Sequence, residues 1–235
     1  MSITTSSHTS TTSVLTEGER QFVLPINTGH ADEYLLTDLP DGRTIITYLS
    51  YDEDGFCCFE PHELFHGWEY QLLDSQRDAD RMSSKFNTCQ TCGDDFDHDD
   101  DTAWHEGEER HEFENEYRTG IENGRCFYIE KYEHGLVRYA LVGESSAVDR
   151  QWDVTGIAGY MLADDDWGPD VDLRQAARNT LQTYTDWCNG NIYGVTTVVY
   201  DADGNQLGDE ESCWGYIGDK FATETMKEDH ESWTQ

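Results

Sequence analysis

Basic residues are scarce in this chain, which has four lysines and eleven arginines against 49 acidic residues, for a net charge of −34. Proteins that bind nucleic acid contact its phosphates through clustered Lys and Arg. The most acidic stretch, residues 94–116, carries twelve acidic residues and Arg110 as its single base. The composition therefore argues against direct nucleic-acid binding.

Long apolar runs are also missing, and the sequence has no secretory signal. We therefore expect no membrane segment and an intracellular, cytoplasmic location. The seven cysteines form an odd number, and in a reducing compartment their thiols stay available for metal. The sequence contains no P-loop, no dinucleotide-binding fingerprint and no G-x-S-x-G motif, which makes an enzyme the minority interpretation.

Acidic residues run along the whole chain instead of forming one tail. Charges of one sign repel one another strongly in dilute buffer, but at 1 M salt the screening length falls to about 3 Å. This favours a halophilic protein adapted to a salt-rich cytoplasm. The alternative is a carboxylate surface that imitates the phosphates of DNA and inhibits a host nuclease or restriction system.

A zinc site is predicted by the spacing C-x2-C-x12-H-x5-H, which is typical of zinc fingers with two cysteines and two histidines. A tight turn would aim two thiolates at one point, and a short helix would supply two imidazoles. Phe96 suits the small core of such a finger, whereas Thr102 stands where a leucine-like residue is expected. The four predicted ligands are Cys89, Cys92, His105 and His111.

Two alternatives stay open for this metal site. His62 and His66 are four residues apart, which on a helix places both imidazoles on one face, so they could replace the later histidine pair. The same stretch also resembles a calcium-binding EF-hand loop, although Asp100 stands where the loop needs glycine. The carboxylates of that alternative are Asp95, Asp97, Asp99 and Glu106.

The apolar pattern predicts an α+β protein. Short strands with a Pro-Asp-Gly turn indicate a β meander, followed by one broken or two short helices up to residue 85. The strands and helices after residue 125 suggest an antiparallel sheet with helices on one face. We predict a disordered leader over 1–20, the meander and helical segment over 21–85, an acidic zinc-finger-like module over 86–120 and an α+β domain over 121–235.

The C-terminal half contains four distinctive strings, at residues 130–139 (EKYEHGLVRY), 149–153 (DRQWD), 187–194 (WCNGNIYG) and 212–218 (SCWGYIG). Through these strings it resembles a set of small acidic proteins of actinobacteriophages, plasmids and haloarchaeal mobile elements. The resemblance implies a viral or mobile-element setting and no mechanism, and the predicted zinc ligands lie outside it.

Aromatic residues are frequent in the same half, and any that lie exposed would mark a partner surface. We predict Trp167, Trp214 and Tyr216 as partner-binding residues, with Trp167 the most exposed because it lies in an acidic loop.

Two sets of residues could instead serve an enzyme. Cys188 or Cys213 could act as a nucleophile with His134 as base, although both cysteines also suit a core. An anion site could form from Arg138, Arg150, Glu144 and Asp153.

Taken together, the sequence predicts a non-enzymatic, zinc-stabilised acidic accessory protein that acts by binding an unknown protein partner. A DNA-mimic inhibitor and an enzyme with a Cys/His or Arg-centred site are the alternatives.

Overall fold

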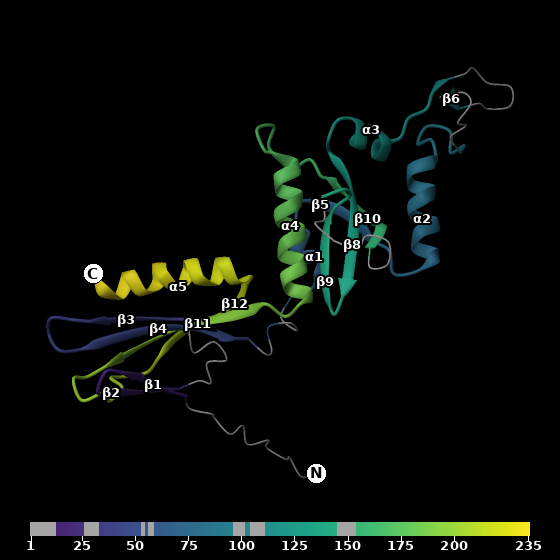
Figure 1. Cartoon of the computed structure of the whole chain (residues 1–235). Coiled ribbons are helices and arrows are strands. Elements are labelled where there is room, and N and C mark those ends of the chain that lie inside the picture. The colour runs from purple at the N-terminus through teal and green to yellow at the C-terminus, as the bar shows by residue number, and fades with distance from the viewer. Residues whose placement is uncertain are drawn as a thin grey trace, which may run out of the picture. The chain divides into compact units, whose positions relative to one another are not determined.

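The chain folds into two compact units. The computed structural model describes residues 13–25, 33–52, 55, 59–95, 102–103, 111–144 and 154–235. The terminal unit is built from both ends of the chain, Met1–Phe59 and Asp186–Gln235, and the central unit is Glu60–Thr185. Figure 1 shows the elements of each unit.

The terminal unit is organised around a four-stranded antiparallel sheet in the order β12-β11-β4-β3. The turn between β3 and β4 is closed by hydrogen bonds from Leu39 N to Arg43 O (2.8 Å) and from Gly42 N to Leu39 O (3.0 Å). The sheet strands are β3 (Tyr34–Asp38), β4 (Thr44–Tyr51), β11 (Ile192–Tyr200) and β12 (Glu211–Ile217).

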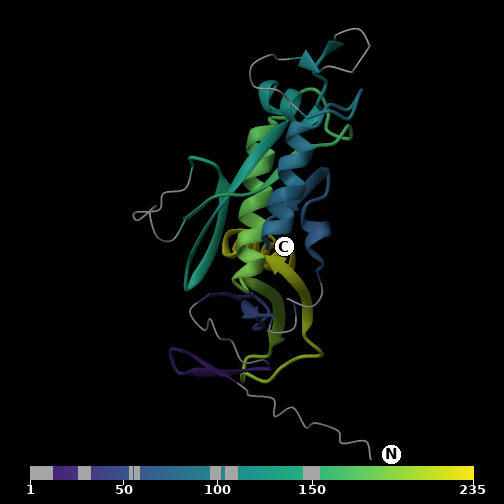
Figure 2. The same cartoon turned by 90° about the vertical axis from the view of Figure 1, so that its right-hand side faces the viewer.

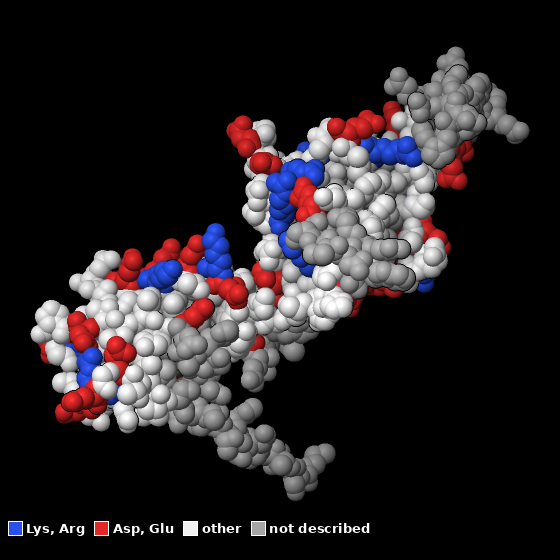
Figure 3. All heavy atoms as spheres, viewed as in Figure 1, with Lys and Arg blue, Asp and Glu red and all other residues white. Residues whose placement is uncertain are grey.

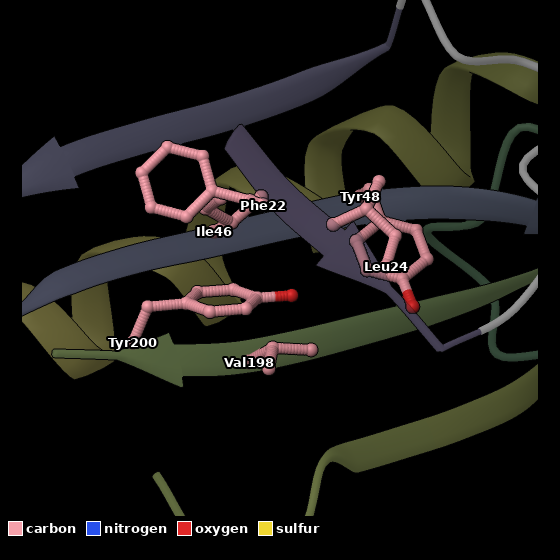
Figure 4. Close-up of a cluster of buried hydrophobic side chains, with 6 residues drawn as sticks. All are labelled: Phe22, Leu24, Ile46, Tyr48, Val198 and Tyr200. Atoms are coloured by element: carbon pink, nitrogen blue, oxygen red, sulfur yellow. The ribbon is translucent and has the colours of Figure 1, made fainter. Parts of the chain in front are cut away.

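Both faces of this sheet are covered, which is why seven successive residues of β4 are buried. The hairpin of β1 (Ser13–Glu17) and β2 (Arg20–Leu24) covers one face, and the helix α5 (Asp219–Thr234) packs on the other (Figures 1 and 2). Under the hairpin lies an apolar core, drawn in Figure 4, which we call the hairpin core. It consists of Phe22, Leu24, Ile46, Tyr48, Val198 and Tyr200.

The face under α5 is partly polar. The ring nitrogens of His230 lie 2.9 Å from the Thr37 hydroxyl and 3.0 Å from the Thr47 hydroxyl. Thr47 in turn lies 2.8 Å from the Thr197 hydroxyl, which donates to Asp229 at 2.6 Å. Burial lowers the pKa of His230, although the charges of Asp229 and Glu231 act in the opposite direction. The folded unit therefore favours the neutral imidazole.

The lowered pKa of His230 leads us to expect that the stability of the terminal unit depends on pH. Because its pKa in the folded protein lies below the ordinary 6.5, unfolded chains take up the proton first as pH falls. The contribution of neutral His230 to the free energy of unfolding is therefore complete above pH 6.5 and is lost as the pH falls below that value. We expect His230→Gln to lose less free energy of unfolding than the wild type between about pH 7 and pH 5, as measured by urea titration. Equal losses would contradict this.

The central unit has a second four-stranded antiparallel sheet, in the order β5-β10-β8-β9. Helix α4 lies on one side of it and α2 on the other (Figure 1). Ring contacts fix both helices: Tyr184 of α4 packs on Tyr139 (4.9 Å between centroids), and Phe86 of α2 packs on Tyr160 (5.4 Å). The sheet strands are β5 (Trp68–Leu72), β8 (Cys126–His134), β9 (Leu136–Leu141) and β10 (Val154–Ala163). The other elements are α1 (Pro61–Leu64), α2 (Gln76–Asn87), β6 (Thr102–Ala103), β7 (His111–Glu112), α3 (Glu116–Glu122) and α4 (Leu173–Cys188).

The α+β class and the N-terminal meander are confirmed. The predicted single C-terminal sheet is not observed, because strands β8 to β10 lie in one sheet and strands β11 and β12 lie in another. The predicted boundary at residue 121 therefore differs from the structure, and the stretch 86–120 lies inside the central unit.

Among the strands longer than two residues, the sequence analysis missed two. β5 lies in a stretch predicted to be helical, but Trp68 and Tyr70 alternate with polar residues and pack against Phe127 and Phe65. β1 lies in the predicted leader and pairs with β2, where Leu15 is opposite Phe22. The rest of that leader, residues 1–12, lies outside the described residues. No helix in the described part of the chain is long and apolar enough to cross a membrane.

Candidate functional site

The two predicted zinc-binding cysteines lie in one tight turn that follows α2. Gly93 N donates to Cys89 O and Cys89 N donates to Asp94 O, both at 2.8 Å, and Thr88 and Asp95 close the turn as a β-bridge. Gly93 has φ +80°, a conformation that side chains beyond glycine rarely adopt. The turn therefore brings two thiol-bearing residues, three positions apart, to one end of α2.

The thiols of this turn interact. Cys89 is buried and Cys92 is half-buried. Burial raises the pKa of Cys92, and a hydrogen bond with Cys89 raises it further, while the backbone near Asp94 acts in the opposite direction. Two adjacent thiols cannot both ionise cheaply without a counter-charge. A cation between them would supply that charge and hold both as thiolates.

The chain returns to this turn just after the second predicted histidine. Gln90 N donates to Glu114 O at 2.8 Å, and the Gln90 side chain donates to Glu116 at 2.8 Å. Asn115 caps α3 and donates to the carbonyls of Lys85 (2.7 Å) and Thr88 (2.8 Å). These bonds fasten the end of the loop beside the cysteines.

His111 begins β7, three residues before Glu114, so their Cα atoms are at most about 11 Å apart. The side chain of His111 and the whole of His105 lie outside the described residues. So do three of the EF-hand carboxylates, Asp97, Asp99 and Glu106. The sequence prediction of the histidine ligands therefore stays a prediction.

The alternative histidine pair does not join the cysteines. His62 lies in the single turn of α1, and His66 lies in the turn after it, both exposed. Among the residues that the structure describes, no three His, Cys, Asp or Glu side chains are grouped so that they could hold a metal. Since His62, His66, Cys89 and Cys92 are all described, the structure does not bring them together.

Trp167 is not the exposed anchor that the sequence predicts. Its indole Nε1 donates to Gly67 O at 2.6 Å, and its ring lies 5.2 Å from the ring of Trp68. The side chain is half-buried as a result. The acidic loop around it misled the prediction, because the ring folds back over β5 while the neighbouring carboxylates face solvent.

Trp214 is exposed as predicted, with 40% of its surface accessible, and it lies on the edge strand β12. Its ring covers Gly194 of β11 so closely that any larger residue there would collide with it. Tyr216 is half-buried: it packs on Phe221 at 5.8 Å between centroids, and a hydrogen bond with Cys213, together with burial, raises its pKa to about 12.

A β-bulge brings Tyr216 next to Cys213. The register between β11 and β12 shifts between Tyr193 and Gly194, so that Tyr216 is opposite Tyr193 while Cys213 is opposite Val195. In a regular strand, residues 213 and 216 would point to opposite faces. The extra residue places both on the face that α5 covers. Sequence alternation gives no signal for this pair.

The central unit contains a polar cluster that sequence reasoning also missed. Tyr117 and Tyr160 donate hydrogen bonds to Glu69 Oε1 (2.8 and 3.0 Å), and Lys85 donates to Glu69 and to the Tyr160 hydroxyl (2.7 Å). Burial opposes the charge on Glu69, but these donors hold its pKa below the ordinary value. Burial raises the pKa of both tyrosines and that of the Cys126 thiol, the latter to about 12. Groups with pKa values shifted in these directions are poor bases and nucleophiles, so we assign the cluster a structural role. Its hydrogen bonds join α2 and α3 to the sheet.

We expect Lys85→Met to lower the free energy of unfolding by about 1 kcal/mol, because the hydrogen bonds are charged but the side chains are partly exposed. Urea unfolding of Lys85→Met, Glu69→Gln and the double variant measures the coupling. Arg81→Met on the same helix is the control, since its ion pair with Asp78 spans 3.7 Å at the surface. Strictly additive effects of the two cluster variants would contradict the assigned contact.

The residues considered for an enzyme lie on several elements, and some of them fall outside the described residues. Glu144 accepts hydrogen bonds from Arg174 and Arg178 of α4, which lower its pKa to about 2. Its predicted partners Arg150 and Asp153 lie outside the described residues. His134 ends β8, Cys188 is the last residue of α4, and Cys213 lies on β12. Comparisons with models of protein families, with curated proteins and with solved structures found no match for this chain.

Proposed function

We propose that this chain is a non-enzymatic, zinc-stabilised acidic accessory protein of a halophilic virus or mobile element, which acts in a salt-rich cytoplasm by binding another protein. The observation that carries the proposal is the exposed Trp214 on β12, a strand at the edge of the terminal sheet. Large aromatic side chains are the usual anchors of protein interfaces. Edge strands also carry backbone groups that can pair with another chain.

The distribution of charge supports salt adaptation. Figure 3 shows Asp and Glu at many separate places among uncharged atoms on the face drawn, with the fewer Lys and Arg over α4, over α5 and elsewhere. A DNA mimic needs carboxylates in rows at the spacing of phosphates, and this face has scattered ones. Scattered carboxylates suit a protein that is folded at high ionic strength, where their mutual repulsion is screened.

In this proposal zinc has a structural role. The stretch between the CxxC turn and α3 is the most acidic of the chain, so its charges oppose compaction. A divalent cation held by Cys89, Cys92, His105 and His111 would offset part of that repulsion and close the loop. No catalytic role is assigned to the metal, because four protein ligands leave no open position for substrate.

Protein binding is tested by capture in high salt. The full chain is immobilised in about 1 M KCl, where non-specific charge attraction is screened, and exposed to lysate of a haloarchaeon. A retained protein is identified, purified and titrated against the wild type and Trp214→Ser. We expect saturable binding that Trp214→Ser weakens about tenfold or more. Failure of the wild type to bind any purified candidate overturns the proposed function.

A further inference from the structure

We propose that the outer edge of β12 accepts an extended segment of the partner as an added strand, with a Lys or Arg side chain placed between Glu211 and Asp229. This inference rests on the proposed function and names the recognised chemistry. It is argued from the exposure of the edge, the cavity beside it and the charges around it.

The edge is open over its first half. In the sheet order β12-β11-β4-β3, β12 pairs with β11 on one side, and among the described residues no strand pairs with its other side. Residues 205–214 are all exposed, and they include Leu207 (43% accessible) and Trp214. An extended peptide can hydrogen-bond to such an edge through its backbone.

A small cavity lies beside this edge, on the face that α5 covers. Its volume is about 110 Å³. The β-bulge described above supplies part of its lining by turning Cys213 and Tyr216 to the same face. Its lining residues are Val195, Glu211, Ser212, Cys213, Tyr216 and Asp229.

The charged side chains that line the cavity determine which kind of side chain it can bind. Asp229 is fixed because one of its carboxylate oxygens accepts from Thr197 at 2.6 Å, and the other oxygen keeps its lone pairs. Glu211 is exposed at the start of β12. With a carboxylate on either side and an apolar lining of Val195 and Tyr216, the cavity suits a cationic head on an aliphatic stem.

A second copy of this chain does not fit the same edge. Residues 201–219 contain no Lys or Arg, and they carry Glu211 at the first position of β12 with Asp209 and Glu210 just before it. Two such edges paired with each other would therefore bring no cation to the cavity between Glu211 and Asp229. The occupant is therefore a partner with basic residues.

Trp214 lies where the residue after the basic one would sit in the added strand. Its ring lies on the opposite face from Cys213, over Gly194, with Nε1 donating to the Ser212 hydroxyl at 3.1 Å. Because side chains of a strand alternate between faces, a segment with a basic residue at the cavity has its next side chain near Trp214. The recognised segment therefore alternates basic and apolar residues.

The test uses three synthetic, fluorescently labelled peptides in about 1 M KCl, the full-length protein, and anisotropy as the readout. The first peptide alternates Lys and Val, the second alternates Glu and Val, and the third is the Lys peptide with N-methylated backbone amides that cannot donate hydrogen bonds. We expect the wild type to bind the first about tenfold more tightly than the other two. Glu211→Lys, which leaves Asp229 as the only carboxylate of the cavity and sets a lysine beside it, should remove most of the preference for the Lys peptide. Asp170→Lys, which changes the net charge equally at an exposed site of the central unit, should leave it unchanged.

Several results would overturn the inference. These are wild-type protein that binds none of the peptides, equal binding of the Lys and Glu peptides, retained binding of the N-methylated peptide, and a preference that Glu211→Lys leaves unaltered. Self-association of the wild type that Glu211→Lys changes would assign the edge to a second copy instead. A purified partner that binds wild type and Glu211→Lys equally removes this inference and leaves the proposed function standing.

Discussion

Phe22→Ala is expected to lower the free energy of unfolding of the terminal unit by about 3–5 kcal/mol. Phe22 is completely buried, and its ring meets that of Tyr200 edge-on at 5.1 Å between centroids. The Arg20 guanidinium also lies over the ring, 5.4 Å from its centroid. The substitution removes all of these contacts and leaves a cavity between the β1–β2 hairpin and the sheet, within the group of side chains drawn in Figure 4.

The neighbouring residue supplies a matched control. Val23 lies on the same strand with 51% of its surface accessible, so Val23→Ala is expected to change stability by no more than about 0.5 kcal/mol. Chemical denaturation followed by circular dichroism compares the two variants with the wild type. A cost for Phe22→Ala below about 1 kcal/mol would show that the hairpin does not cover the sheet in solution.

Removal of either cysteine of the CxxC turn is expected to abolish zinc binding and to lower the stability of the central unit strongly. Structural zinc sites in small finger peptides bind with about 10–16 kcal/mol at neutral pH, and that binding energy stabilises the folded chain. We expect the wild type, loaded with zinc and dialysed, to retain one ion per chain. Cys89→Ser and Cys92→Ser should retain none, as measured by elemental analysis.

Two controls separate this site from the rest of the chain. Cys213→Ser changes an exposed cysteine of the terminal unit and should leave the zinc content unchanged. His62→Ala with His66→Ala should do the same, whereas His105→Ala and His111→Ala should each weaken zinc binding. A wild-type protein that takes up no zinc, or one that loses zinc in the His62 and His66 variant, would contradict the assigned ligands.

The strands and helices with clear periodicity could be predicted from the sequence. The run from residue 192 to 200 and the stripe of Leu173, Ala177, Leu181 and Tyr184 have strong patterns, and both are elements of the structure. Sheet membership could not be predicted, because β11 pairs with β4, some 150 residues earlier, and no local pattern records such a partner. β5 was misread for a related reason: a five-residue strand gives too short a period to distinguish it from a helix.

The candidate site was predictable only in part. The spacing of Cys89 and Cys92 indicates a metal turn, and the structure places both in one tight turn. The pair of Cys213 and Tyr216 depends on a β-bulge, and the Glu69 cluster depends on contacts between β5, α2, α3 and β10. Exposure of Trp167 was predicted from its acidic neighbours, but the hydrogen bond to Gly67 fixes the ring against β5.

The terminal unit is assembled from the first 59 and the last 50 residues of the chain, and this dictates an order of events during synthesis. The central unit is contiguous, so it can fold as soon as it has left the ribosome. The N-terminal strands must wait, because β4 gains β11 only after residue 200 has been translated and gains α5 only after residue 234 has been translated. The nascent chain therefore carries β3 and β4 with the partly apolar face that α5 later packs on still uncovered, and a dense negative charge is one means of keeping such an intermediate from aggregating.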